Sequence, residues 1–196
     1  GWKDENGVEV NSGRMNLGVV TVNLPRIALE SEGDMNKFWE IFNERMNIAE
    51  DALVYRVERT KEATPANAPI LYQYGAFGRR LGKEESVDQL FKNRRATISL
   101  GYIGLYEVAT VFFGNHWENN PEAKEFTLDI IRDMKRRVEE WSDQYGYHFS
   151  IYSTPSESLT DRFCRLDTEK FGSIPDITDK EYYTNSFHYD VRKNPT

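Results

Sequence analysis

The residues best suited to chemistry lie in 150–158, where hydroxyl side chains surround the predicted start of a helix. Residues 148–152 alternate polar and apolar types, which is typical of a strand. Thr154 then fits an N-cap, Pro155 fits the first helical position, and Glu157 would complete a capping box. A helix start presents unpaired backbone N–H groups and the positive end of the helix dipole. The spacing therefore predicts a site for an anion such as a phosphate.

The same segment also has an interpretation without a ligand. In that case the side chains of Thr154 and Glu157 satisfy the donors at the helix start themselves. The order of elements along the chain favours the phosphate, because strands alternate with long helices as in parallel sheets and barrels. Ligands in such folds bind at the carboxyl ends of the strands, where this segment lies. Both interpretations stay open at this point.

Three strand–helix units are expected to position this segment, and they predict an α/β fold. Residues 17–24 are rich in β-branched types and predict a strand covered on both faces. The predicted organisation is a loop over 1–16, units over 17–59, 70–145 and 148–172, and a C-terminal segment over 173–196. The predicted strands are 17–24, 70–74, 96–101, 148–152 and 182–189. The predicted helices are 34–59, 102–109, 121–145 and one that follows 148–152 and ends at Gly172.

The two long helices carry apolar residues at helical spacing, which predicts that one face of each is buried. The stripe of the first helix is Phe38, Phe42, Arg45, Ala49, Leu53 and Val57. The stripe of the second helix is Phe126, Ile130, Met134, Val138 and Trp141. Burial of these faces would favour one wall of a larger fold, whereas exposure would favour a partner-binding surface.

Composition excludes several classes of function. The net charge of -7 argues against a nucleic-acid partner, which requires clustered Lys and Arg. No run of about 18 apolar residues predicts a membrane span, and no secretory leader is recognisable. The single cysteine, Cys164, excludes an internal disulfide or multi-cysteine metal site in this chain, and its helical context predicts a buried thiol. A reducing cytoplasm is therefore the expected compartment.

Familiar catalytic motifs are missing from the sequence. It contains neither a Gly-x-x-x-x-Gly-Lys-Ser/Thr loop nor a strand-associated Gly-x-Gly-x-x-Gly. His116, His148 and His188 are scattered without metal-ligand spacing, so no metal site is predicted. The residues by themselves thus predict an α/β domain with a candidate anion site and no particular reaction.

Five blocks of the sequence are more specific. They are 13–28 (GRMNLGVVTVNLPRIA), 99–107 (SLGYIGLYE), 152–159 (YSTPSESL), 161–164 (DRFC) and 182–188 (YYTNSFH). In type and order the blocks resemble the oxygen-sensitive anaerobic ribonucleoside-triphosphate reductases, a family of glycyl-radical enzymes. The resemblance extends over essentially the whole chain, and it implies part of a ten-stranded α/β barrel.

The resemblance also implies that the chain is an internal fragment, because members of the family are several times longer. The thiyl-forming cysteine of the family lies shortly before the block that begins at Gly13, and nothing after Asn185 resembles the radical-glycine motif. The fragment alone is therefore expected to be inactive, and Cys164 is assigned no catalytic role.

The implied reaction converts ribonucleoside triphosphates to deoxyribonucleoside triphosphates by glycyl and thiyl radicals, with formate as reductant. Asn16 matches an asparagine near the substrate ribose, where a neutral amide can hydrogen-bond a hydroxyl without quenching a radical. Tyr152 would line the site beside the sugar. The segment implied to bind the triphosphate is Ser153, Thr154, Ser156, Glu157 and Ser158. Glu157 fits poorly beside phosphate unless it turns toward the cap or toward Mg²⁺.

For the full-length protein the resemblance implies a glycyl radical, zinc in a C-terminal cysteine cluster, ATP and dNTP effectors, and formate. None of these cofactors is expected within this fragment. The implied partners are the nucleoside triphosphate substrate, a radical-SAM activating enzyme and a second copy in a homodimer, with neither nucleic acid nor membrane.

Other interpretations remain. Asn16 also fits a simple turn residue, and Tyr152 also fits an ordinary aromatic of a barrel interior. The chain could instead be a non-catalytic nucleotide-binding or dimerisation module whose long helices bind a partner. It could also belong to a glycyl-radical enzyme that acts on a carbon substrate, in which case the 153–158 segment would serve another purpose.

Overall fold

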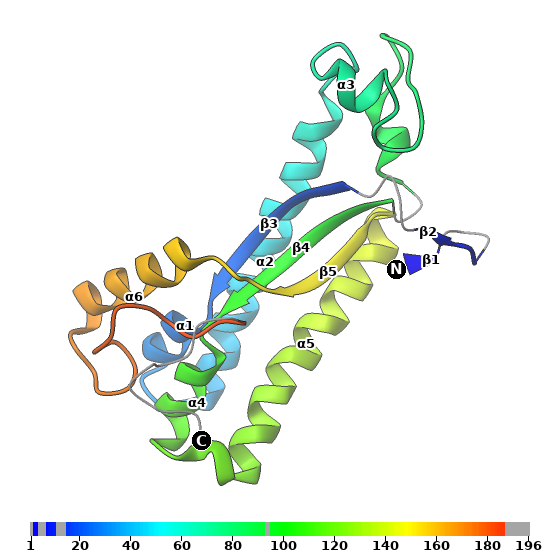
Figure 1. The fold of residues 1–196 in the computed structure, drawn as a ribbon. Coiled ribbons are helices and arrows are strands. Elements are labelled where there is room, and N and C mark those ends of the chain that lie inside the picture. The colour runs from blue at the N-terminus through cyan, green and yellow to red at the C-terminus, as the bar shows by residue number, and fades with distance from the viewer. Residues whose placement is uncertain (1, 4–6, 11–14, 93–94, 187–196) are drawn as a thin grey trace. The chain divides into compact units, whose positions relative to one another are not determined.

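A computed structural model describes residues 2–3, 7–10, 15–92 and 95–186, and it contains a three-stranded parallel sheet. The strands β3 (Met15–Asn23), β4 (Ala96–Ile103) and β5 (His148–Ser153) are hydrogen-bonded in the order β3-β4-β5 (Figure 1). Helices connect these strands along the chain, as parallel pairing requires. The predicted α/β fold is confirmed.

Helices make up most of the remaining chain. They are α1 (Leu24–Glu30), α2 (Met35–Lys61), α3 (Pro69–Tyr72), α4 (Leu105–Phe113), α5 (Pro121–Tyr145) and α6 (Glu157–Phe171). The 3-10 turns η1 (Val87–Leu90) and η2 (Trp117–Asn119) and an antiparallel pair, β1 (Trp2–Lys3) with β2 (Glu9–Val10), complete the set. Among the described residues, no helix combines the length and apolar character needed to cross a bilayer.

Side-chain caps explain where the two long helices begin. The Asp34 carboxylate accepts hydrogen bonds from the backbone N–H groups of Asn36 (2.8 Å) and Lys37 (3.1 Å) at the start of α2. Asn120 accepts from the backbone N–H of Glu122 at 2.9 Å at the start of α5. Such caps satisfy donors that have no partner within the helix. The predicted helices 34–59 and 121–145 are confirmed, and so are the strands at 17–24, 96–101 and 148–152.

Three of the predicted elements differ from the structure in type or in bounds. Residues 70–74 are not a strand, because Pro69 begins α3 and its carbonyl accepts from the Gln73 backbone N–H. The helix predicted over 102–109 begins only at Leu105, since residues 102–103 complete β4. Residues 182–186 form no strand, and the rest of the range predicted there, 187–189, lies outside the described residues.

Helix α1 was not predicted at all. Pro25 fits the end of the preceding strand equally well, but here it lies in the first turn of the helix. Asn23 is the N-cap, and its Oδ1 accepts from the Arg26 backbone N–H at 3.2 Å. Strand β3 therefore leads directly into α1, without a loop between them.

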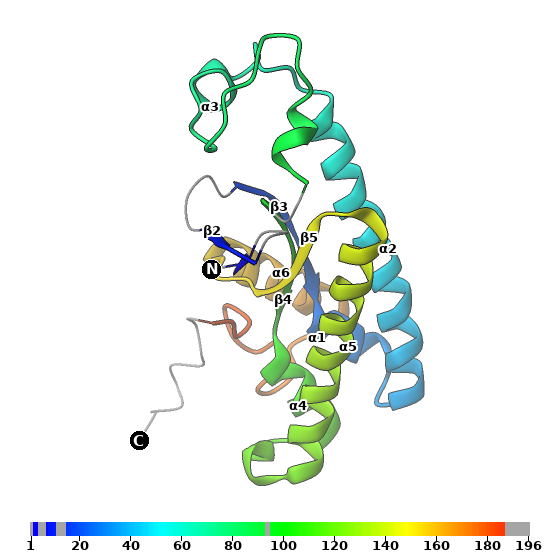
Figure 2. The ribbon, with the colours of Figure 1, turned by 90° about the vertical axis from the view of Figure 1, so that its right-hand side faces the viewer.

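The chain divides into two compact units, and the division passes through all three strands of the sheet. One unit comprises residues 1–20, 49–100 and 135–151, and the other comprises 21–48, 101–134 and 152–196. In the second unit α1 packs against α4, as Figures 1 and 2 both show. An aromatic cluster fills the core of the same unit: Phe38, Trp39, Phe42, Phe112 and Phe126.

The apolar stripes of the long helices are buried. All the stripe residues named for α2 and α5 are buried except Arg45, whose place in the core is taken by Met46. Arg45 instead pairs with Glu30 at 2.9 Å. Burial of these stripes favours a wall of a larger fold over a partner-binding surface.

Candidate functional site

Helix α6 begins at Glu157, and its N-cap is Ser156. Ser156 has an extended backbone (φ -104°, ψ 108°), and its side chain makes no capping hydrogen bond within the described part of the chain. The predicted capping box, with Thr154 as cap and Pro155 at the first helical position, is therefore wrong. The N–H groups of the first turn are not satisfied by the cap side chain, which is the arrangement an anion site needs.

Thr154 does not cap the helix because its polar groups are used elsewhere. Its hydroxyl lies 2.9 Å from the hydroxyl of Thr21, and its backbone N–H donates to the Tyr102 carbonyl at 3.2 Å. Its carbonyl accepts from the Asn185 amide nitrogen at 3.1 Å. With 7% of its surface exposed, Thr154 is part of the framework beneath the segment.

A cavity of about 300 Å³ opens at the carboxyl ends of β4 and β5. Ser153 lines it from β5, and Tyr102 lines it from β4, together with Thr184 and Asn185 from the segment after α6. Gly104 forms part of its wall, in the left-handed conformation (φ 81°), and a Cβ there would overlap the ring of Pro25. Only glycine fits this turn. The cavity lies at the carboxyl edge of the sheet, where parallel α/β folds bind ligands.

A second cavity, of about 520 Å³, lies along the first turn of α6. It is lined by Glu157, Ser158, Asp161 and Glu181, so three carboxylates face it. Concentrated negative charge disfavours a phosphate inside this cavity, and leaves only the part of the helix start outside the cavity for an anion. The predicted site residues thus fall on two surfaces, with Ser153 on the first cavity and Glu157 and Ser158 on the acidic one.

Asn16 and Tyr152 lie in different units, so their convergence stays a prediction. Asn16 is an exposed residue of β3, and its Oδ1 accepts from the Gly18 backbone N–H at 3.0 Å. This contact fits a turn residue and leaves the amide nitrogen as the donor that could reach a sugar hydroxyl. Tyr152 is 41% exposed at the end of β5.

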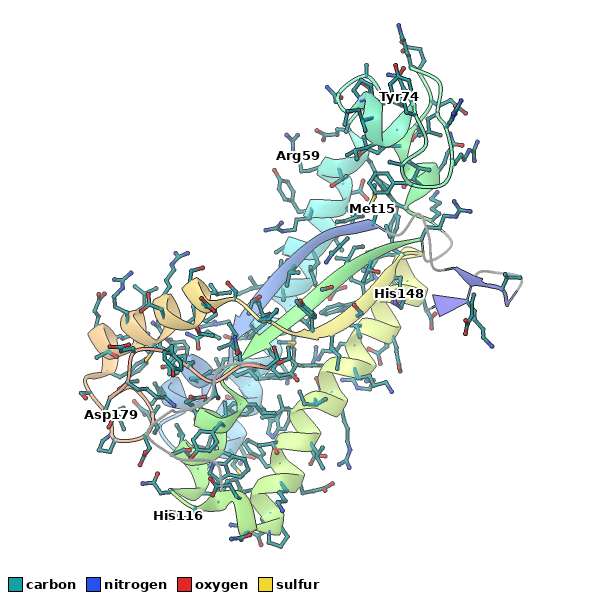
Figure 3. All side chains as sticks on the ribbon, viewed as in Figure 1. Met15, Arg59, Tyr74, His116, His148 and Asp179 are labelled. Carbon is teal, nitrogen blue, oxygen red and sulfur yellow. The ribbon has the colours of Figure 1, made fainter. Side chains whose placement is uncertain are left out.

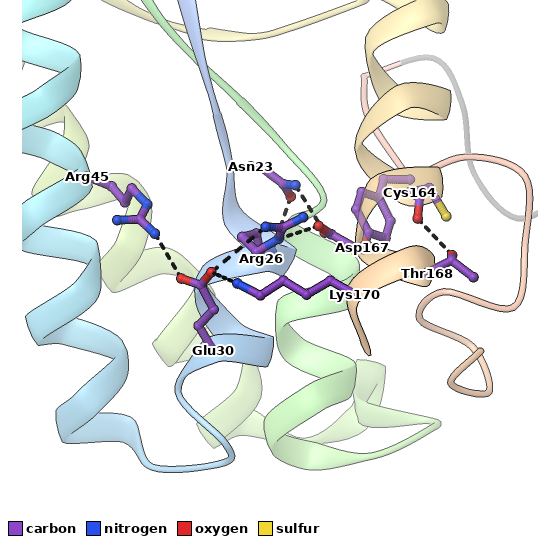
Figure 4. A network of polar contacts seen from close by, with 9 residues as sticks. Asn23, Arg26, Glu30, Arg45, Cys164, Asp167, Thr168 and Lys170 are labelled. Carbon is purple, nitrogen blue, oxygen red and sulfur yellow. Dashed lines mark hydrogen bonds and ion pairs between the residues drawn. The ribbon is translucent and has the colours of Figure 1, made fainter. Parts of the chain in front are cut away.

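Asp167 of α6 is the centre of a buried polar network (Figure 4). Its carboxylate accepts hydrogen bonds from the Asn23 amide (3.0 Å), the Arg26 guanidinium and the Tyr183 hydroxyl (2.7 Å). Burial raises the pKa of Tyr183, and the neighbouring Asp167 carboxylate raises it further. The network joins the turn between β3 and α1 to α6. Sequence reasoning missed it because no spacing pattern relates residues so far apart in the chain.

Cys164 is buried, which confirms the prediction of a buried thiol. Its Sγ lies 3.1 Å from the Lys180 carbonyl. Burial raises the pKa of the thiol to about 11, so that the reactive thiolate is scarce at neutral pH. This environment fits the assignment of no catalytic role.

Two of the three histidines lie within the described residues. His116 lies in the turn before η2, and His148 is the first residue of β5 (Figure 3), whereas His188 lies outside the described residues. No group of three His, Cys, Asp or Glu side chains able to hold a metal occurs among the residues that the structure describes.

These features define an α/β domain with a ligand-sized cavity at the carboxyl edge of a parallel sheet. The chain belongs to the anaerobic ribonucleoside-triphosphate reductase family, whose model matches residues 3–196. It is 49% identical over 193 residues to the anaerobic ribonucleoside-triphosphate reductase of Escherichia coli, covering 98% of this chain and 27% of that protein. It is 50% identical over 194 residues to that of Haemophilus influenzae, again covering 98% of this chain and 27% of that protein.

Solved structures agree with the sequence relatives. The anaerobic ribonucleotide reductase from Thermotoga maritima in complex with dATP and CTP matches with a TM-score of 0.68 and 26% identity. That match covers 88% of this chain and 27% of the other. The chain thus spans about a quarter of the length of the curated relatives it matches.

Proposed function

We propose that this chain is part of the catalytic barrel of an enzyme that reduces ribonucleoside triphosphates to deoxyribonucleoside triphosphates. The observation that carries the proposal is the family match along residues 3–196, because it includes both β3 and the segment between β5 and α6. The cavity at the ends of β4 and β5 supports it, since substrates of parallel α/β folds bind at that edge.

The segment between β5 and α6 is proposed to bind the triphosphate. Backbone N–H groups of the first turn of α6 would donate to phosphate oxygens, helped by the positive end of the helix dipole. The Ser156 hydroxyl does not cap the helix, so it can serve as a further donor. Ser153, which lines the cavity at the ends of β4 and β5, would contact the triphosphate from that side. Thr154 holds the segment in place through its hydrogen bond with Thr21.

Glu157 and Ser158 require a different role, because they line the acidic cavity. We propose that Glu157 contacts the Mg²⁺ that accompanies the triphosphate and not the phosphate itself, since carboxylate oxygens are ligands that Mg²⁺ prefers. Ser158 would contribute through its backbone N–H, which would donate to a phosphate oxygen at the helix start.

Asn16 and Tyr152 are proposed to lie beside the ribose. The Asn16 amide nitrogen would donate to a sugar hydroxyl, because its oxygen already accepts from Gly18. The exposed ring of Tyr152 would cover one side of the sugar and exclude water from it. Both roles require the two units of the chain to form one site in the full-length protein.

The whole protein is proposed to use a glycyl radical, which supplies the one-electron chemistry, with formate as reductant and zinc bound outside this chain. Its proposed partners are a radical-SAM activating enzyme and a second copy in a homodimer, and its proposed compartment is the cytoplasm. The Thermotoga maritima relative was solved with dATP and CTP, which supports nucleotide effectors in this protein as well.

The test is an anaerobic assay of the full-length protein with activating enzyme, formate and each ribonucleoside triphosphate. Deoxyribonucleoside triphosphates are expected as products, whereas the 196-residue chain alone is expected to give none. Formation of the protein radical without any deoxynucleotide product in the full-length protein would contradict the proposed function.

A further inference from the structure

Glu107 is a fully buried carboxylate in the first turn of α4. It accepts hydrogen bonds from Lys180 Nζ, from the Thr184 backbone N–H at 3.0 Å and from the Thr184 hydroxyl at 2.7 Å. The Lys180 side chain is itself only 6% exposed. A buried carboxylate that is paired with a charge and accepts further hydrogen bonds is held in one geometry.

The residues that Glu107 holds belong to a segment, 180–186, that we call the strap. Thr184 is fixed from two directions, because its carbonyl also accepts from the Gly104 backbone N–H at 2.9 Å. The turn that carries both Gly104 and Glu107 packs closely against Pro25, since a side chain at Gly104 would overlap the proline ring. Glu107 thus ties the strap to the carboxyl end of β4.

The far end of the strap is hydrogen-bonded to the segment between β5 and α6. The Asn185 amide nitrogen donates to the Thr154 carbonyl at 3.1 Å. The Ser186 hydroxyl donates to the Ser153 carbonyl at 3.3 Å. A continuous series of contacts therefore runs from Glu107 through Thr184 to the residues that precede the α6 N-cap.

We propose that Glu107 is a positioning residue that, through the strap, holds the segment between β5 and α6 in the geometry that binds the triphosphate. The inference rests on the proposed function, because the geometry that Glu107 maintains is that of the proposed triphosphate site. Glu107 does not contact the nucleotide. When its contacts to the strap are lost, the carbonyls of Ser153 and Thr154 lose their donors and the start of α6 becomes mobile. Triphosphate affinity then falls, whereas chemistry at a bound sugar proceeds as before.

The main test uses Thr184→Val in the full-length protein, because it removes one hydrogen bond to Glu107 and nearly preserves side-chain shape. The KM for the ribonucleoside triphosphate is expected to rise roughly tenfold, as for loss of a hydrogen bond to a charged group, with kcat changed less than about twofold. Thr184→Ser retains the hydroxyl and should restore the KM. Thr127→Val, which removes an exposed hydroxyl of α5, is the matched control and should have no effect.

A second measurement separates this inference from the proposed function. Amide hydrogen exchange over residues 152–158 of the full-length protein requires no turnover, and Thr184→Val should accelerate it relative to wild type and Thr184→Ser. If the wild-type protein makes no deoxynucleotide, the proposed function fails and the exchange still decides whether the strap orders the segment. Unchanged exchange in Thr184→Val, or an unchanged KM in an active enzyme, would overturn the role of Glu107.

Discussion

The hydroxyls of Thr21 and Thr154 lie 2.9 Å apart, so the end of β3 is joined to the residue that follows β5. Thr154 is almost completely buried, and its backbone also pairs with Tyr102 and Asn185. A buried hydroxyl without a partner costs free energy. This pair therefore keeps the segment before α6 in register with the sheet, although 133 residues separate the two threonines in the sequence.

The threonine pair is testable by a double-mutant cycle. Thr21→Val and Thr154→Val should each lower the free energy of unfolding by about 1–2 kcal/mol, because each leaves one hydroxyl without its partner. The double variant should lose less than the sum of the two, since both polar groups are then gone. Urea unfolding of the four proteins measures the coupling. Strictly additive losses would show that the hydroxyls do not interact.

Asp167→Asn should be much more damaging than an exposed substitution on the same helix. The carboxylate is fully buried, and its loss removes the buried partner of Arg26, which keeps only the longer contact with Glu30 at 3.9 Å, at a cost of about 3–5 kcal/mol. Glu169→Gln on the exposed face of α6 is the control, with an expected change within about 0.5 kcal/mol. Denaturant unfolding compares them, and equal losses would contradict the central place of Asp167 in the network.

The lowered pKa of Asp88 predicts that the stability of the unit that contains η1 depends on pH. Burial acts to raise the pKa of its carboxyl, but hydrogen bonds from Tyr147 (2.8 Å) and Lys92 and the charge of Lys61 outweigh burial. The pKa in the folded protein is therefore below the ordinary value of 3.8. The unfolded chain then binds protons more readily, so the stabilisation is present above pH 3.8 and is lost as the pH falls through the folded pKa.

Thermal unfolding between pH 7 and pH 3 checks this sign. The difference in Tm between wild type and Asp88→Asn should shrink as the pH falls below about 4. Tyr147→Phe removes the main hydrogen bond that lowers the pKa and should weaken the same pH dependence. A difference that grows on acidification would mean that the pKa of Asp88 is raised instead.

Cys164 should be unreactive in the folded protein. With a pKa of about 11, caused by burial, its thiol is almost entirely protonated at pH 8 and shielded from reagents. Mass spectrometry of the peptide that contains Cys164 should show little alkylation by iodoacetamide until urea unfolds the protein. Rapid labelling of the native protein would contradict the structural role assigned to this thiol.

The sequence was most informative where the periodicity is long or the local chemistry is unambiguous. Residues 121–145 combine an Asn-Pro helix start with a sustained apolar stripe, and the structure contains a helix over that range. Residues 17–24 and 148–152 show the β-branched and alternating patterns that strands require, and all of them lie in the sheet except Leu24, which begins α1. Helical and strand periodicities reflect burial on one face, which is a property that the sequence carries locally.

The errors occur where contacts between distant residues override a local motif. Thr154 has the sequence context of an N-cap, but Thr21, Tyr102 and Asn185 engage its polar atoms, so the helix begins two residues later than predicted. Pro25 illustrates a different limit, because proline suits both the end of a strand and the first turn of a helix. The contacts of Glu107 with the strap could not be predicted, since no local spacing relates residues 73 and more positions apart.

A structure of the full-length protein with a bound ribonucleoside triphosphate tests the central claim most directly. Phosphate oxygens should lie within about 3.2 Å of the backbone nitrogens in the first turn of α6, and the Asn16 amide should lie at hydrogen-bonding distance from the ribose. A triphosphate bound away from the start of α6, with Asn16 distant from the sugar, would contradict the account.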